Sequence, residues 1–456
     1  MKRAIIAIAV VLAGIAASQG RIITVDDDGP ADFSAIQAAI DDANDGDTVL
    51  IADGRYTGAG NRDLDFHGKA ITVKSQNGPE HCIIDCNGTP SEPHRGFYFH
   101  SFERQDSVLS GLTVTNGYAV AGGGIYCDRA SPTIENCIIA RNQAEGAGGI
   151  CWLFNSPQEA ALSGCVIVDN RADYIGGIYV GTYGAYTSSL TVRNCLIARN
   201  TAVDEGGGVG ADTDDVLTFE ACTFADNSAE LGGGLYCMQG RFALRNCILW
   251  GNSAAIGPEI SDSGCHCAPP CTVVNIYYCD LQGGREGVHA DYCANYSGIF
   301  FREGNIDADP CFADPSQNDY HLKSQGGRWD ANEGGWTTDE VTSVCIDAGD
   351  PTSPIGNEPF PSGGRLNMGA YGGTNEASKS YFGEPPCETI VAGDVNGDCR
   401  VDFLDFSLIA RHWMEDNSPC GSVTTTYLFQ ADPNALTTSG GQGGVKEASL
   451  SKAGSS

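Results

Sequence analysis

Basic residues are scarce in this chain of 456 residues, where 26 Lys and Arg stand against 58 Asp and Glu and the formal net charge is −32. No lysine occurs between Lys74 and Lys323. A strongly negative surface repels phosphate backbones and anionic lipids, so nucleic acids and anionic membranes are excluded as partners. The same charge favours the binding of divalent cations.

Long apolar runs are also lacking, apart from one at the amino terminus. The run from residue 4 to residue 16 follows Lys2 and Arg3 and precedes small residues, which is the pattern of a secretory signal peptide with cleavage near Ser18 or Gly20. We therefore expect the protein to be secreted or held at the cell surface. No later run reaches the length of a membrane-spanning helix, so no membrane insertion is expected.

Five copies of one sequence pattern dominate the middle of the chain. Each copy begins with a cysteine and has an asparagine at its sixth position, and the copies start at Cys137, Cys165, Cys195, Cys222 and Cys247. An apolar residue stands three positions before each cysteine, and a Gly-Gly pair separates successive copies. One unit therefore recurs every 25 to 30 residues, which indicates a repeat protein.

The spacing inside the unit predicts short strands joined by tight bends. Each cysteine and the residue two positions later face the same side of a strand, whereas the apolar residue three positions earlier is out of phase, so the chain must bend between them. The bend holds Asn136, Gly164, Asn194, Ala221 and Asn246. Because Asn and Gly adopt left-handed backbone angles at the least cost, we expect such angles at these positions.

Units of this length cannot bury their own apolar face, so they must stack on their neighbours. We therefore predict an all-β parallel β-helix in which equivalent residues form columns about 4.8 Å apart. A helical repeat of similar period is the alternative. The Gly pairs, the bends and the short β-branched runs argue against it.

A short amphipathic pattern precedes the coils. Residues 34–37 read Ser-Ala-Ile-Gln, which is a capping box, and Ile36, Ala39 and Ile40 form one apolar helix face. We predict a helical cap that closes the first coil, followed by a strand over Thr48–Ile51.

The repeat resembles that of a known superfamily. Its units are similar to the coils of the pectate lyase-like proteins, which fold as right-handed parallel β-helices. The pairing of Gly-Gly-x-[Ile/Leu/Val] with [Phe/Ile/Leu]-x-x-Asn is similar to repeats of chlamydial polymorphic outer-membrane proteins, and Phe224-Ala-Asp-Asn227 matches the second motif fully. The resemblance covers about residues 40–300. It implies a right-handed β-helix but no single function, because members include lyases, hydrolases, esterases, adhesins and structural spikes.

The 20 cysteines fall into two groups by position. The five repeat cysteines face the predicted interior, where we expect free thiols that behave as small apolar side chains. Cysteines outside the repeat lie in loops rich in Gly and Pro, and most of them are expected to form disulfides in an exported protein. This second group includes Cys265, Cys267, Cys271, Cys293, Cys311, Cys345, Cys387 and Cys420.

Variation in coil length is confined to one edge of the predicted solenoid. The segment from the repeat asparagine to the strand after Gly-Gly takes eight or nine residues, whereas the segment from that strand to the next pre-cysteine residue varies from 9 to 14. The longer loops carry aromatic rings, which stack on sugars, and carboxylates, which bind hydroxyls or calcium. We predict an extended polysaccharide site made of Trp152, Phe154, Tyr183, Tyr186, Asp212, Asp214 and Asp215. The alternative is that these aromatic residues only cover the flank of the solenoid.

A column of alternating charge stands just before the repeat asparagines. It consists of Arg141, Asp169, Arg199, Asp226 and Gly251. An ion-pair ladder between coils is favoured over a catalytic arginine. The resemblance implies that a lyase would use a Lys or Arg base beside calcium, and the motifs of polygalacturonase-like hydrolases, an Asp pair after Asn-Thr-Asp and a Gly-His-Gly, are absent. Asp214 and Asp215 could act as an acid/base pair only on a loop, because neighbours on a strand face opposite sides.

Oxygen-bearing side chains near the carboxyl terminus have the spacing of a calcium loop. Positions 1, 3, 5, 9 and 12 hold Asp394, Asn396, Asp398, Asp402 and Asp405, and Arg400 stands at position 7. The segment is similar to one half of a type I dockerin, an EF-hand-like module, which implies a Ca²⁺ cofactor and a cohesin-like scaffold partner. It departs from that pattern at Cys399, where Gly is usual, and it lacks the second calcium repeat. An acidic linker is the alternative.

These patterns divide the chain into six parts. We predict a signal peptide at 1–20, a cap with the first coils at 21–110, β-helix repeats at 111–300, a capping or accessory segment at 301–386, the dockerin-like module at 387–420 and a disordered tail at 421–456. We expect an exported protein that binds polysaccharide without catalysis. The alternative is a polysaccharide lyase or glycoside hydrolase that joins an assembly through the dockerin-like module.

Overall fold

A computed structural model describes residues 20–154, 159–182, 189–262, 272–290 and 298–383, together with 395, 401, 403 and 405–407. The chain divides into two compact units, Met1–Leu408 and Ile409–Ser456, and every described residue belongs to the first. Within the described ranges, no helix is both long enough and apolar enough to cross a membrane. The predicted signal peptide and tail lie outside the described residues, apart from Gly20.

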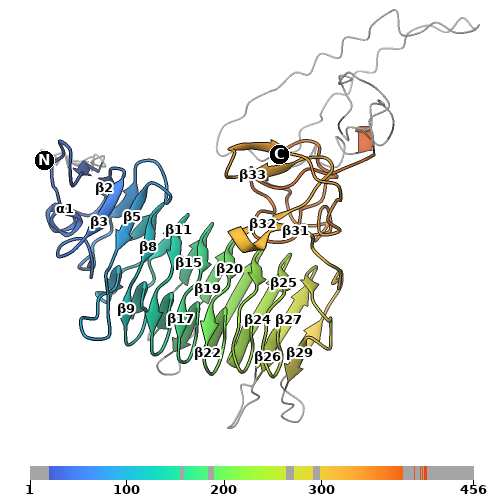
Figure 1. Ribbon diagram of the computed structural model, residues 1–456, viewed down its shortest axis with the longest axis horizontal. Coiled ribbons are helices and arrows are strands. Elements are labelled where there is room, and N and C mark those ends of the chain that lie inside the picture. Colours follow the sequence, from blue (N-terminus) through green and yellow to red (C-terminus); the bar gives the residue numbers. More distant parts are fainter. Residues whose placement is uncertain are drawn as a thin grey trace, which may run out of the picture. The chain divides into compact units, whose positions relative to one another are not determined.

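Parallel strands stacked coil upon coil form a β-solenoid (Figure 1). Its largest sheet contains 17 strands in two parallel ladders, which the long strands β22 (Val209–Glu220) and β24 (Leu235–Arg245) join. The first ladder also contains β1 (Ile22–Val25), β2 (Thr48–Ile51), β4 (Thr72–Ser75), β7 (Val108–Ser110), β11 (Thr133–Glu135), β15 (Glu159–Ser163), β19 (Ser189–Arg193), β27 (Val273–Tyr277) and β30 (Gly298–Phe301). The second ladder also contains β6 (Phe97–Phe99), β10 (Ile125–Asp128), β14 (Ile150–Phe154), β18 (Ile178–Thr182), β26 (Ile260–Asp262) and β29 (Val288–Ala290).

Two smaller parallel sheets complete the coils. The nine-stranded sheet contains β3 (Gly54–Thr57), β5 (Cys82–Asp85), β8 (Thr113–Thr115), β12 (Ile138–Ala140), β16 (Val166–Val168), β20 (Leu196–Ala198), β23 (Thr223–Ala225), β25 (Ile248–Trp250) and β28 (Asp280–Leu281). The four-stranded sheet contains β9 (Tyr118–Ala119), β13 (Gln143–Ala144), β17 (Arg171–Ala172) and β21 (Thr201–Ala202). The all-β parallel solenoid that the repeat predicts is therefore confirmed.

The tight bends also follow the prediction. The φ angles at the five bend positions lie between 50° and 60°, in the left-handed region, at Asn136, Gly164, Asn194, Ala221 and Asn246. Ala221 takes the same conformation although alanine has no preference for it, because the strands on both sides are held by the neighbouring coils. The stack of coils therefore imposes the bend even where the residue does not favour it.

The repeat cysteines line the interior of the solenoid as free thiols. All five are 0 % exposed. Cys165 illustrates their environment, because its Sγ donates to the carbonyl oxygen of Ser163 at 3.3 Å. Burial raises the pKa of Cys137 well above its usual range, so that thiol stays neutral. The predicted column of buried thiols is confirmed.

A ladder of buried asparagines ties successive coils together. The Nδ2 of Asn200 donates to the carbonyl oxygen of Ile167 at 2.9 Å and to Oδ1 of Asn227 at 3.0 Å. Its Oδ1 accepts from the backbone N–H and from Nδ2 of Asn170 at 3.1 and 3.0 Å. The ladder runs through Asn142, Asn170, Asn200, Asn227 and Asn252.

Close stacking explains the Gly-Gly pairs. A Cβ placed on Gly177 would lie 2.3 Å from the carbonyl oxygen of Gly208 in the next coil. Any side chain at this position would push the coils apart and break the ladder beside it.

The predicted N-terminal helix is α1 (Ile36–Asp42), and its three apolar residues are buried against the first coil. The predicted capping box is wrong. The helix begins after Ala35, and no side chain caps it from within the segment. Instead, Oδ1 of Asn61 accepts from the backbone N–H of Ile36 at 3.0 Å, because the loop of the next coil supplies the acceptor.

Residues 302–383, here called the C-terminal segment, fold back over the outer face of the nine-stranded sheet (Figure 1). Apolar outward residues such as Leu196 and Ile248 pack there against Tyr320 and Met368. The segment contains β31 (Phe312–Asp314), η1 (Pro315–Gln317), β32 (Asp319–Leu322), β33 (Arg328–Asp330) and β34 (Gly335–Thr337). It therefore covers a flank of the coils.

Two cysteines of this segment correct the disulfide prediction. Cys311 and Cys345 are free thiols. Cys345 is buried and its Sγ donates to Oδ2 of Asp280 at 3.0 Å, so a carboxyl group takes the place of a bridging cysteine. The other six cysteines of the predicted disulfide group lie outside the described residues.

Candidate functional site

Trp152 does not project from a loop, and its prediction as a sugar-binding residue is wrong. Its side chain is 0 % exposed, and its Nε1 donates to the carbonyl oxygen of Ala130 at 2.8 Å. Strand β14 continues through this position, so Trp152 faces inward, two residues after the buried Ile150.

The remaining loop residues are described only in part. Asp212 is exposed. Tyr183 and Tyr186 lie outside the described residues, and so do the side chains of Phe154, Asp214 and Asp215. The predicted loop site, apart from Trp152, stays a prediction.

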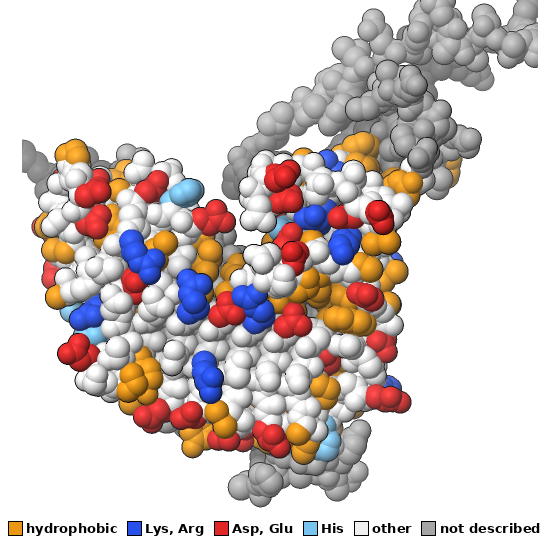
Figure 2. Space-filling view, in the orientation of Figure 1, with side chains coloured by type: hydrophobic (Ala, Val, Ile, Leu, Met, Phe, Trp, Pro, Cys, Tyr) orange, Lys and Arg blue, Asp and Glu red, His pale blue; other side chains and the backbone are white. Residues whose placement is uncertain are grey.

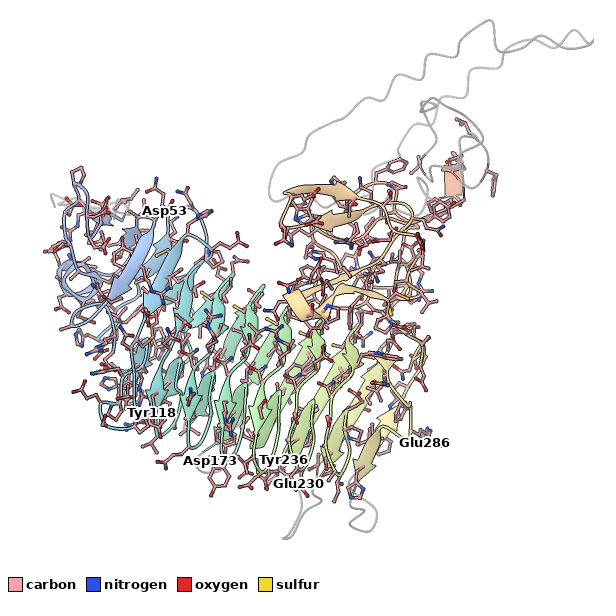
Figure 3. All side chains as sticks on the ribbon, viewed as in Figure 1. Asp53, Tyr118, Asp173, Glu230, Tyr236 and Glu286 are labelled. Carbon is pink, nitrogen blue, oxygen red and sulfur yellow. The ribbon has the colours of Figure 1, made fainter. Side chains whose placement is uncertain are left out.

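A row of tyrosines crosses the outer face of the strands that lead to these loops. Strand pairing aligns the outward positions of successive coils, which are Tyr98, Tyr126, Cys151, Tyr179, Gly210 and Tyr236. We call the three partly exposed members, Tyr98, Tyr126 and Tyr179, the tyrosine row. Tyr236, labelled in Figure 3, is 4 % exposed, so it is not counted in the row.

The ring of Tyr179 lies along its own strand. A Cβ placed on Gly181 would lie 2.9 Å from Oη and 3.0 Å from Cε1 of Tyr179, so the ring passes over this glycine. The missing side chain at Gly181 leaves room for this ring, which is partly exposed. Strand pairing places the exposed Asp212 beside Gly181 in the next coil. An aromatic ring thus lies near a carboxylate.

Tyr98 and Tyr126 form a stack at the other end of the row. Their ring centroids are 5.2 Å apart with an interplanar angle of 4°. The guanidinium of Arg95 lies 5.1 and 5.0 Å from the two centroids. In the described part of the chain, Nη1 of Arg95 has no hydrogen-bond partner, and the ring faces take that place through cation–π contacts. Burial lowers the pKa of Arg95, while Tyr98 and Asp63 oppose this.

Cys151 lies between Tyr126 and Tyr179 and is 2 % exposed. Burial raises the pKa of its thiol to about 12, although Arg95 acts in the opposite direction. The thiol is therefore neutral and contributes packing rather than reactivity to the row.

The sequence-based prediction assigns sugar binding to the loops and not to the tyrosine row, although the sequence contains a signal for the row. The string Gly-[Ile/Leu]-Tyr recurs at Tyr126, Tyr179 and Tyr236. In a strand whose Ile or Leu faces the core, the next residue must face outward.

The charge column contains one ion pair that also anchors the C-terminal segment. Nε and Nη2 of Arg199 lie 2.9 and 2.6 Å from the two carboxylate oxygens of Asp169, which raises the pKa of Arg199. Nη1 of Arg199 donates to the carbonyl oxygens of Pro315 and Ser316, both at 3.3 Å. With its guanidinium engaged in this way, Arg199 has a structural role. Among the five described members of the column this is the one ion pair between them, so the predicted ladder is confirmed at a single step.

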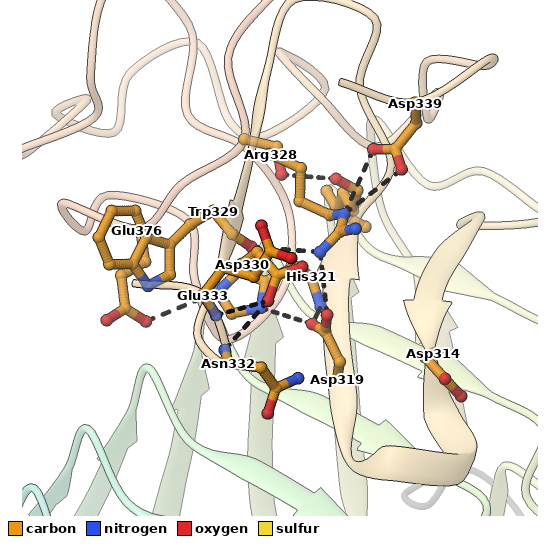
Figure 4. A network of polar contacts seen from close by, with 12 residues as sticks. Asp314, Asp319, His321, Arg328, Trp329, Asp330, Asn332, Glu333, Asp339 and Glu376 are labelled. Carbon is orange, nitrogen blue, oxygen red and sulfur yellow. Dashed lines mark hydrogen bonds and ion pairs between the residues drawn. The ribbon is translucent and has the colours of Figure 1, made fainter. Parts of the chain in front are cut away.

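A second polar network lies inside the C-terminal segment (Figure 4). Nδ1 of His321 is 2.7 Å from the carboxylate of Asp319, and Nε2 is 3.5 Å from that of Glu376. Arg328 pairs with Asp319 and Asp339 at 3.0 and 3.3 Å. Burial alone would lower the pKa of His321, but its two carboxylate partners raise it. His321 is 3 % exposed, so this network stabilises the segment rather than contacting a substrate.

Of the predicted calcium ligands, only Asp405 is described. It is 1 % exposed, and its Oδ1 accepts from the backbone N–H of Val395 at 2.8 Å. This bond brings the last carboxylate of the loop next to its second residue, as a closed loop requires. The predicted ligands that lie outside the described residues are Asp394, Asn396, Asp398, Arg400 and Asp402.

Comparison with known proteins identifies the solenoid. A family described as "Right handed beta helix region" matches residues 42–187 and 147–269, which together span 228 of the 456 residues. A family described as "Disaggregatase related" matches residues 286–349. No curated protein matches the sequence. The crystal structure of pectate lyase Pel9A aligns with a TM-score of 0.38 and 16 % identity over 77 % of this chain and 96 % of that one, a similarity too low to indicate a shared function.

Proposed function

The chain belongs to the right-handed β-helix family, and on this scaffold we propose that the tyrosine row, together with Asp212, binds an extended polysaccharide without cleaving it. The observation that carries the proposal is the partly exposed ring of Tyr179 lying close over Gly181 beside an exposed carboxylate. The apolar face of a sugar ring stacks on such a surface, and the carboxylate accepts hydrogen bonds from sugar hydroxyls.

The repeat supports a linear ligand. Tyr126 and Tyr179 occupy equivalent positions two coils apart, so their backbones are separated by about 10 Å along the solenoid. A chain molecule with repeating units can contact both positions. Because the strands are held by hydrogen bonds on both sides, little ordering is needed on binding, which favours affinity.

The negative charge of the protein indicates which class of polysaccharide it can bind. The exposed Asp212 stands at one end of the row, and the whole chain carries a formal charge of −32. Repulsion between like charges disfavours a strongly acidic polymer. We therefore propose a neutral polysaccharide as the ligand.

Affinity electrophoresis of the full-length protein in gels containing neutral or acidic polysaccharides tests this proposal. Tyr179→Ala should weaken retention by a neutral polymer about fivefold, since a stacking contact contributes about 1 kcal/mol. Gly181→Val should have a similar effect, because a side chain there displaces the ring. Tyr174→Ala is the matched control, since Tyr174 belongs to the same coil, is 54 % exposed and lies outside the row. Equal retention of all variants would refute the site.

The same samples test the alternative, a polysaccharide lyase or glycoside hydrolase. The release of unsaturated or reducing ends by the parent protein would favour that alternative. The engagement of Arg199 with Asp169 supports the non-catalytic proposal, because it leaves this arginine unsuited to act as a base.

We also propose that the loop from Asp394 to Asp405 binds one Ca²⁺ and that the protein acts outside the cell. The bond between Val395 and Asp405 supports a closed loop. Asp394, Asn396, Asp398, Asp402 and Asp405 would supply carboxylate and amide oxygens to the ion, which would order the helix that follows. Docking to a cohesin-like scaffold is part of the same proposal.

A further inference from the structure

A pocket lies where the C-terminal segment meets strands β23 and β25. Its volume is about 290 Å³. It is lined by Asp226, Trp250, Asp309, Cys311, Phe312, Pro315, Lys323 and Val341. Figure 2 shows hydrophobic side chains beside acidic and basic ones along this junction. Pockets for drug-sized ligands measure about 300–1000 Å³, so this one fits a single ring better than a chain.

The pocket is open because the charge column is interrupted. In the preceding coil, Arg199 reaches back to Asp169 and pairs with its carboxylate. The position that would serve Asp226 in the same way is Gly251, where a Cβ would lie 2.6 Å from Oδ1 of Asp226. Because residue 251 is glycine, no arginine from the next coil pairs with the carboxylate of Asp226. Oδ2 of Asp226 accepts instead from the hydroxyl of Tyr320 at 2.8 Å, which holds the carboxylate in place.

The charges on the pocket wall do not neutralise one another by direct contact. Among the described residues, Lys323, Asp226 and Asp309 form no ion pair with each other or with a third group. The wall therefore offers one ammonium donor and two carboxylate acceptors, with a formal excess of one negative charge. Trp250 and Phe312 add aromatic surface, and both are partly buried against the apolar cluster under the segment.

We propose that this pocket binds one sugar ring, and that it prefers a ring with a free amine over a ring with a carboxylate. The indole of Trp250 stacks on the ring, Asp226 and Asp309 accept from the amine and hydroxyls, and Lys323 donates to a ring or hydroxyl oxygen. The excess negative charge favours an amino sugar and disfavours a uronic acid. This inference does not rest on the tyrosine row.

Isothermal titration calorimetry of the full-length protein with glucosamine, glucose and glucuronate tests the inference. The affinities should fall in that order. Asp226→Asn should weaken glucosamine binding about tenfold or more, because a hydrogen bond between charged groups contributes about 1.5–3 kcal/mol. Asp173→Asn, at an exposed aspartate outside the pocket, is the control and should bind as the parent does.

Gly251→Arg gives an independent test that copies the protein's own pairing of Arg199 with Asp169. The left-handed φ of 75° at Gly251 is close to the 53° that Arg199 adopts, and the nearest atom to a new Cβ is Oδ1 of Asp226, at the movable end of a side chain. This variant should lose glucosamine binding while it still unfolds in a single cooperative thermal transition. Tyr179→Ala should leave glucosamine binding unchanged. No saturable binding by the parent at millimolar glucosamine, tighter binding of glucuronate, or full binding by a folded Asp226→Asn protein would each overturn the assignment.

Discussion

The substitution Asn200→Ala measures how much the buried asparagine ladder stabilises the solenoid. The side chain of Asn200 makes four hydrogen bonds, two as donor and two as acceptor. Alanine leaves the carbonyl oxygen of Ile167, two N–H groups of Asn170 and Oδ1 of Asn227 without these partners in the interior. Each lost bond costs about 0.5–1.5 kcal/mol, so the free energy of unfolding should fall by about 3–5 kcal/mol.

Arg199→Ala is the matched comparison, because Arg199 precedes Asn200 and points outward. The side chains of Arg199 and Asp169 are 28 % and 30 % exposed, so solvent screens their attraction. Including the bonds to the C-terminal segment, we expect a loss of about 1–2 kcal/mol. Urea unfolding followed by circular dichroism gives both values, provided that the slope of the transition is unchanged.

The comparison of these two neighbours can refute the reasoning. A cost below about 1 kcal/mol for Asn200→Ala would mean that the coils are held by backbone bonds and apolar packing alone. An equal or larger cost for Arg199→Ala would mean that the outer ion pair, rather than the inner ladder, fixes the register of the coils.

Three further predictions follow from single groups. Trp152→Ala should cost about 3–5 kcal/mol in urea unfolding and leave polysaccharide retention by the folded protein unchanged, because Trp152 fills the core; reduced retention by a fully folded variant would contradict this. Burial raises the pKa of Glu259 to about 8 although Asn252 donates to it, so the folded state holds a proton that the unfolded state loses near pH 4–5. Its contribution to stability should therefore be complete below about pH 4 and be lost as the pH rises through 8, and Glu259→Gln should remove this part of the pH dependence in unfolding experiments between pH 4 and 9. In calorimetry, the full-length parent protein should bind one more Ca²⁺ per chain than the Asp394→Ala/Asp405→Ala variant. An equal number of bound ions per chain would refute the calcium loop.

The repeat made the solenoid predictable because its signals are local. The cysteine at each strand and the bend before it lie within a few residues of each other, so alternation alone assigns Cys137 to the interior and Asn136 to a left-handed bend. The same alternation could have placed Trp152 correctly. The prediction for Trp152 is wrong because it places this residue in a loop, whereas β14 continues to Phe154.

The candidate sites depended on contacts between coils and between distant segments. The position of the Tyr179 ring requires Gly181 on the same face, and its carboxylate neighbour Asp212 comes from the next coil. The sequence contains all three residues, but only strand register shows that they are adjacent.

The amino-acid sequence by itself determined the period, the inward columns and the bends, because each of these depends on residues close together in the chain. Only the tertiary structure decided where the C-terminal segment lies. Outward apolar residues of the nine-stranded sheet, such as Leu196, need a cover, and Tyr320 provides it from more than 120 positions away. That packing forms the pocket at Asp226. The sequence could not predict it, because burial of apolar surface is not directional and no local pattern states which distant segment will cover the sheet.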